Sequence, residues 1–91
     1  MSLKQIQMEL NEILLANGFT KTKLDKSNFE KSFLSSPFSM NYITLYELLI
    51  CVENHFKCSF SPKQIEEFGF HTPYQICKLV RDQLVYSSDV N

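Results

Sequence analysis

Apolar residues along this chain recur at helical spacing rather than in alternation with polar residues. In the first segment they fall three or four positions apart and form one face of a predicted helix from about Leu3 to Asn17, with Gly18 as a typical helix stop. Comparable patterns predict three further helices, which run from Asn41 to about Phe56, from Pro62 to about Phe68 and from Pro73 to about Tyr86. The pattern therefore predicts an all-α protein with three longer helices and a short third one.

Three of the predicted helices open with a hydroxyl residue followed three positions later by glutamine. In such a capping box each side chain accepts a hydrogen bond from a free backbone N–H at the helix start. The segments are Ser2 to Gln5, Ser61 to Gln64 and Thr72 to Gln75. The remaining helix follows Asn41, which is a good N-cap residue. These signals define where the helices begin.

A long segment from Phe19 to Ser39 separates the first two helices. It is rich in Ser, Lys, Asn and Thr, and a structureless connection of this length is uncommon in a compact domain unless it is functional or attached to the core. It also contains large apolar residues, namely Leu24, Phe29, Phe33, Leu34 and Phe38. We expect these side chains to pin the segment to the core.

The second predicted helix is apolar on more than one face. At about 100° per residue, one arc forms a core face made of Leu45, Leu48, Leu49, Val52 and Phe56. Ile43, Tyr46 and Ile50 fall on the opposite side, near Glu47 and Glu53, where a solvated helix should be polar. Each of the three could pack against the long segment or the third helix. As a set, they predict a docking surface with an apolar centre and a charged margin.

Composition excludes several classes of function. The 91 residues carry 9 Lys and Arg against 10 Asp and Glu, a net charge of −1, which suits one small domain spanning residues 1–91. A nucleic-acid binder would need a basic patch or recognition helix, and none is present. The longest apolar run, from Leu48 to Val52, is too short to span a membrane. An odd count of 3 cysteines favours reduced thiols and a cytoplasmic protein.

The chemistry-bearing residues do not form a recognisable catalytic or metal-binding pattern. His55 and Cys58 make one loose pair, whereas zinc sites combine two closely spaced pairs. Glycine-rich phosphate loops, nucleophile elbows and zinc-protease motifs are lacking. We therefore expect neither a metal site nor enzymatic activity from this chain.

The stretch from Asn41 to Phe56, together with the two proline-containing helix starts, resembles the acyl carrier protein family, and especially its D-alanyl carrier branch. The family pattern reads Asp-Ser-Leu or Asp-Ser-Met, three variable residues, Glu or Gln, Leu, and a closing Phe. Glu47, Leu48 and Phe56 keep this spacing. The resemblance implies a four-helix acyl-carrier-type bundle with a long loop between its first two helices.

One position departs from the family. Tyr42 stands where the family has the serine that receives 4′-phosphopantetheine, and Asn41 stands where it has the preceding Asp. A phenol lies several ångströms further from the backbone than a serine hydroxyl, so we expect no modification at Tyr42 and no cofactor on the standard position. In a shifted register Ser39, followed by Met40, is the alternative attachment residue.

The resemblance also implies a function. In carrier proteins the helix after the modified serine docks to partner enzymes, and its contact positions fall here on Ile43, Tyr46 and Ile50. It implies a carrier-like domain of fatty-acid, polyketide or nonribosomal-peptide type metabolism, with a synthase, ligase or transferase as partner. The alternative is an arm-less docking or regulatory subunit, that is, one without the phosphopantetheine arm, which never carries a thioester. Because carrier proteins are usually strongly acidic, the net charge of −1 is a second departure from the family.

Overall fold

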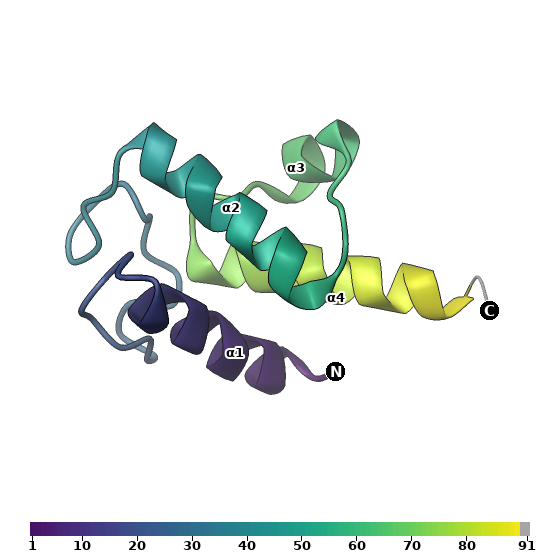
Figure 1. The fold of residues 1–91 in the computed structure, drawn as a ribbon, viewed down its shortest axis with the longest axis horizontal. Coiled ribbons are helices and arrows are strands. Elements are labelled where there is room, and N and C mark those ends of the chain that lie inside the picture. Colours follow the sequence, from purple (N-terminus) through teal and green to yellow (C-terminus); the bar gives the residue numbers. More distant parts are fainter. Residues whose placement is uncertain (90–91) are drawn as a thin grey trace.

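The described chain contains four α-helices, and a long loop separates the first two (Figure 1). The structure is a computed structural model, which describes the backbone of residues 1–89 and the side chains of residues 1–85. The helices are α1 (Leu3–Ala16), α2 (Tyr42–Phe56), α3 (Pro62–Phe68) and α4 (Pro73–Asp89). The predicted helices are all confirmed, and α4 continues past the predicted end at Tyr86.

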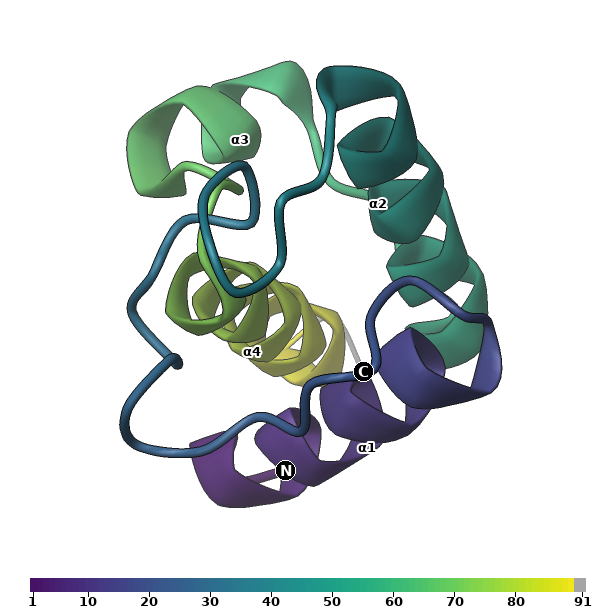
Figure 2. The same cartoon turned by 90° about the vertical axis from the view of Figure 1, so that its left-hand side faces the viewer.

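The helices form a small bundle in which α1 runs opposite to both α2 and α4 (Figure 1). The end-on view shows the three longer helices around a common centre, with α3 at the top beside the start of α2 (Figure 2). Helix α1 packs against α4 and α2, while α3 packs against α4. The predicted all-α bundle with a short third helix is therefore confirmed.

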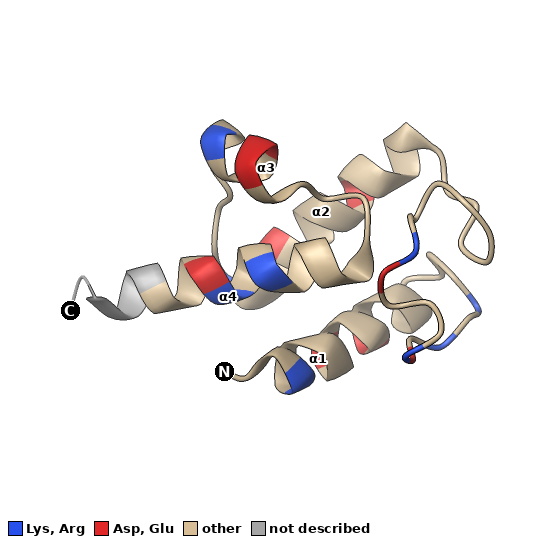
Figure 3. Cartoon of the chain, turned by 180° about the vertical axis from the view of Figure 1, so that it is seen from behind, with Lys and Arg blue, Asp and Glu red and all other residues tan. Residues whose placement is uncertain are grey.

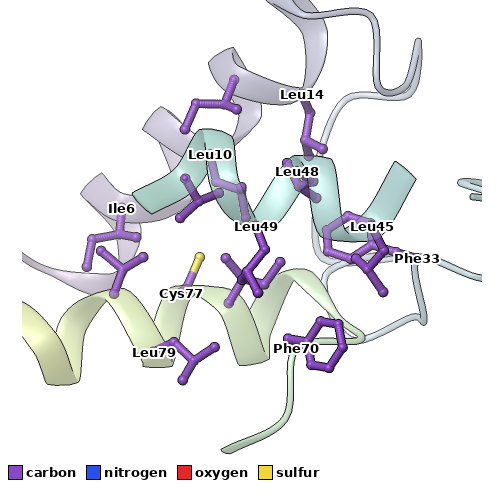
Figure 4. Close-up of a cluster of buried hydrophobic side chains, with 14 of the residues drawn as sticks. Ile6, Leu10, Leu14, Phe33, Leu45, Leu48, Leu49, Phe70, Cys77 and Leu79 are labelled. Atoms are coloured by element: carbon purple, nitrogen blue, oxygen red, sulfur yellow. The ribbon is translucent and has the colours of Figure 1, made fainter. Parts of the chain in front are cut away.

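A single cluster of buried apolar side chains fills the space between the helices (Figure 4). Each of the longer helices contributes one face, and the fully buried members include Ile6, Leu10, Leu14, Leu45, Leu48, Val52, Ile76, Leu79 and Val80. Burying one such side chain contributes about 1.5 to 3 kcal/mol. The α2 core face is the predicted one, although Phe56 at its end is only partly buried.

The predicted caps are present at the helix starts. Both bonds of the α3 capping box form, with Ser61 accepting from Gln64 N–H and Gln64 accepting from Ser61 N–H. The start of α4 has the same pair between Thr72 and Gln75. At α1 half of the predicted box forms: the Ser2 hydroxyl accepts from the backbone N–H of Gln5, but the Gln5 side chain does not bond the Ser2 N–H in return. Local sequence therefore determines these boundaries.

The long segment between α1 and α2 is attached to the core, as its apolar residues predict. Leu24, Phe33 and Phe38 are buried, and the last two lie with their ring centroids 5.0 Å apart. Backbone hydrogen bonds add a second attachment: Phe33 N–H donates to the carbonyl of His71 at 2.6 Å, and Tyr74 N–H donates to the carbonyl of residue 29 at 3.0 Å. The segment is thereby joined to the α3–α4 loop, residues 69–72, and to the first turn of α4.

Candidate functional site

The first turn of α2 begins where the cap residue predicts. The Asn41 side chain oxygen accepts a hydrogen bond from Thr44 N–H at 2.8 Å, so Asn41 is the N-cap. Tyr42 is consequently the first helical residue, and 54% of its surface is exposed. This turn therefore presents a phenol to solvent at the start of the helix.

The outward face of α2 carries large apolar side chains in contact with water. Ile43 is 72% exposed, Ile50 57% and Tyr46 54%, whereas Leu45 and Leu48 on the inner side are fully buried. The angular separation into two faces is confirmed. Together with Tyr42, the three outward residues form what we call the α2 stripe. Contiguous exposed apolar surface of this kind is typical of an interaction site.

Two aromatic residues of the α3–α4 loop border the α2 stripe on one side. The Tyr42 ring meets the His71 ring edge-on, with centroids 6.0 Å apart, and the Tyr46 and Phe70 rings lie 5.6 Å apart. The Phe70 and His71 rings are tilted by 37° to one another, with centroids 4.7 Å apart. Sequence reasoning had left these two loop residues out of the site. Their place in a short apolar-aromatic connection just before the Thr72 cap was the available signal.

The α3–α4 loop is held by a glutamine clamp. The Gln75 side chain oxygen accepts from His71 N–H at 2.8 Å and from Thr72 N–H at 3.1 Å. Gly69 has φ +79°, and a Cβ there would lie 2.6 Å from the Gln75 side chain nitrogen. With the bond from Phe33 to the His71 carbonyl, both backbone polar groups of His71 are used. The rings that border the α2 stripe therefore stand on a fixed backbone.

The two acids predicted for the charged margin have different surroundings. Glu47 is exposed to solvent. Glu53 is only partly exposed, and its carboxylate accepts the Phe60 backbone N–H at 2.7 Å, which ties the α2–α3 loop to α2. Helix α2 contains no Lys or Arg (Figure 3). The margin of the α2 stripe is therefore acidic, with Glu47 as its exposed carboxylate.

Ser39, the alternative attachment residue, lies outside α2. Its side chain is exposed, and its backbone has φ 49°, in the left-handed region. Its N–H donates to the carbonyl of Ser35 at 2.8 Å. The next residue, Met40, is buried, and its backbone N–H donates to the carbonyl of Phe33. Ser39 therefore belongs to the long segment and precedes the cap of α2.

The histidines and cysteines lie apart from a metal-binding arrangement. Among residues 1–85, no group of three His, Cys, Asp or Glu side chains is placed to hold a metal ion. His55 Nε2 lies 2.9 Å from Glu9 Oε1 and joins α2 to α1. Burial raises the pKa of the Cys77 thiol to about 12, and burial followed by the charge of Glu53 raises that of Cys58. Both thiols are therefore held in the protonated, unreactive form near neutral pH.

No family model, curated protein or solved structure matches the chain. The resemblance to carrier proteins therefore rests on the residues of α2 and on the helix starts. Within the described helices, no span is long and apolar enough to cross a bilayer.

Proposed function

We propose that this chain is an acyl carrier protein-like domain of fatty-acid, polyketide or nonribosomal-peptide type metabolism. It docks to a synthase, ligase or transferase through the α2 stripe, and it carries no phosphopantetheine on Tyr42. The observation that supports this most is the exposure of Ile43, Tyr46 and Ile50 on a helix face that otherwise should be polar. Covering one isoleucine fully contributes about 1.5 to 3 kcal/mol, so a partner that buries this stripe gains substantial affinity.

The start of α2 supports the arm-less form of this proposal. Asn41 is the N-cap of α2, and Tyr42 is its first helical residue. Tyr42 occupies the position that the resemblance aligns with the family's serine. The Tyr42 ring stands edge-on to His71. A transferase pocket shaped for a serine hydroxyl would not align this phenol for in-line attack, since a displacement of about 1 Å can cost about a hundredfold in rate.

A carrier modified at Ser39 is the second candidate, and it is favoured by the exposure of that side chain. Intact mass after incubation with coenzyme A and a promiscuous phosphopantetheinyl transferase separates the two. We expect no added mass on the wild-type chain. Addition of one arm would contradict the arm-less proposal, and its loss in Ser39→Ala would identify the attachment residue. A Tyr42→Ser variant that becomes modified would support the register in which Tyr42 replaces the serine.

Docking is tested separately from modification. The chain is added as a competitor while the same transferase modifies an authentic acyl carrier protein, and the inhibition constant is measured. We expect inhibition by the wild type and its loss in Ile43→Asp or Ile50→Asp. Met8→Asp is the matched control, because Met8 is 63% exposed and lies on α1. Helical circular dichroism should be the same for all variants. Equal inhibition by the wild type and the α2 variants would contradict docking through this face.

A further inference from the structure

We propose that the α3–α4 loop is the second half of the docking surface, and that Gln75 is a positioning residue that holds it. On this proposal, which rests on the proposed function, Tyr42 and Tyr46 are fixed by the loop for contact with an amphipathic helix of the partner. His71 belongs to the contact surface. The partner's basic side chain faces Glu47, on the side away from the loop.

The order of residues around α2 makes this surface asymmetric. At about 100° per residue, Tyr42 and Tyr46 lie on one side of Ile43 and Ile50, and Glu47 lies on the other. The two tyrosines contact His71 and Phe70. Across the surface there is first an aromatic wall, made of the two tyrosines with Phe70 and His71. The two isoleucines follow, and Glu47 comes last. Glu53, which the same count places on the tyrosine side, is engaged by the Phe60 N–H, so Glu47 is the exposed acid that gives the surface its direction.

The wall depends on the glutamine clamp. His71 lies in the loop between α3 and α4; its N–H donates to the Gln75 side chain oxygen, and its carbonyl accepts from Phe33 N–H. Phe70 precedes it and is buried against the core. If the Gln75 oxygen is removed, the His71 and Thr72 N–H groups lose their acceptor, and the His71 ring loses its fixed position beside Tyr42.

An amphipathic helix is the occupant that this shape favours. Ile43, Tyr46 and Ile50 are spaced three and then four residues apart, as at the contact positions of helices packed side by side. They extend over about 10 Å, or two helical turns. Because α2 offers acids and no Lys or Arg, the charge complement of the partner helix is a Lys or Arg opposite Glu47.

A rigid wall strengthens docking because the tyrosine side chains need not be ordered when the partner binds. Each side chain that is disordered in the free protein and becomes ordered on binding lowers the affinity roughly two- to tenfold. We therefore expect Gln75→Ala to raise the inhibition constant in the competition assay by about tenfold. Gln64→Ala is the matched control, since Gln64 holds the same place in the α3 capping box and also bonds Asp82.

Two further variants separate positioning from general destabilisation. Gln75→Glu keeps a side chain acceptor at the cap and should restore inhibition. His71→Ala removes the ring but keeps both backbone hydrogen bonds, so it should weaken inhibition even if Gln75→Ala fails to fold. In the NMR spectrum, the chemical shifts of the Tyr42 ring should change in Gln75→Ala and remain unchanged in Gln64→Ala.

The outcomes are distinct. Weak inhibition by Gln75→Ala and His71→Ala, with inhibition by Gln64→Ala close to that of the wild type, supports the composite surface. Inhibition by Gln75→Ala and His71→Ala equal to that of the wild type overturns it while leaving docking through α2 intact. Absence of inhibition by the wild type overturns the proposed function, and this inference with it.

Discussion

Replacing Gly69 with alanine perturbs both a backbone conformation and the clamp on the α3–α4 loop. Gly69 caps α3 with φ 79° and ψ 173°, a region that is essentially restricted to glycine. A Cβ would also lie 2.6 Å from the Gln75 Nε2 atom and 2.9 Å from its Cδ atom. Gly18 is the natural comparison, because it has φ +72° but no atom within 4 Å of an added Cβ.

The two contributions set the expected magnitude. An unfavourable backbone region costs about 1 to 3 kcal/mol, and this applies to both glycines. At Gly69 the Gln75 side chain must also move, which breaks a capping box worth about 0.5 to 2 kcal/mol. We therefore expect Gly69→Ala to lower the free energy of unfolding by about 1.5 to 5 kcal/mol, against about 1 to 3 kcal/mol for Gly18→Ala.

Urea unfolding followed by helical circular dichroism measures both values. A double-mutant cycle then isolates the clash: in a Gln75→Ala background, Gly69→Ala should cost about 1 kcal/mol less than in the wild type. Equal costs at Gly69 and Gly18, or strict additivity between Gly69→Ala and Gln75→Ala, would refute the view that Gly69 makes room for the clamp.

Three further predictions concern the core, a loop and a thiol. Phe33→Ala should lower the free energy of unfolding by about 3 to 5 kcal/mol, because the ring is fully buried; a urea-unfolding loss below 1 kcal/mol would contradict this. Glu53→Ala should cost about 1 to 2 kcal/mol by leaving the Phe60 N–H unpaired, with exposed Glu47→Ala nearly neutral in the same measurement. Burial raises the pKa of Cys77 to about 12, so above about pH 9 the unfolded chain releases a proton that the native chain keeps. Stability should therefore fall from pH 9 towards 12, with a contribution from Cys77 of at most about 1.4 kcal/mol per pH unit, and fall less steeply in Cys77→Ala.

Most of the fold could be predicted because its signals are local. A cap residue bonds a backbone N–H two or three positions away, and the core face of α2 follows from helical geometry alone. Ser61, Thr72 and Asn41 therefore marked their helix starts correctly. The end of α4 was less predictable, since no glycine or proline follows Tyr86, and the helix continues to Asp89.

The candidate site could be predicted only in part. The exposure of Ile43 and Ile50 follows from their angle on α2, and it is confirmed. The role of Glu53 did not follow, because its partner is the Phe60 backbone in the next loop. Whether α2 docks to an enzyme, and whether Ser39 or any other residue carries an arm, stay predictions for the experiments above.

By itself, the sequence determined the helices, their caps and the inner and outer faces of α2. These properties depend on spacing within one helix or on bonds between near neighbours. Only the tertiary structure decided that Phe70 and His71 border the α2 stripe and that Gln75 holds them there. The physical reason is that the contact between α2 and the α3–α4 loop depends on how the shared core packs, which no local spacing records.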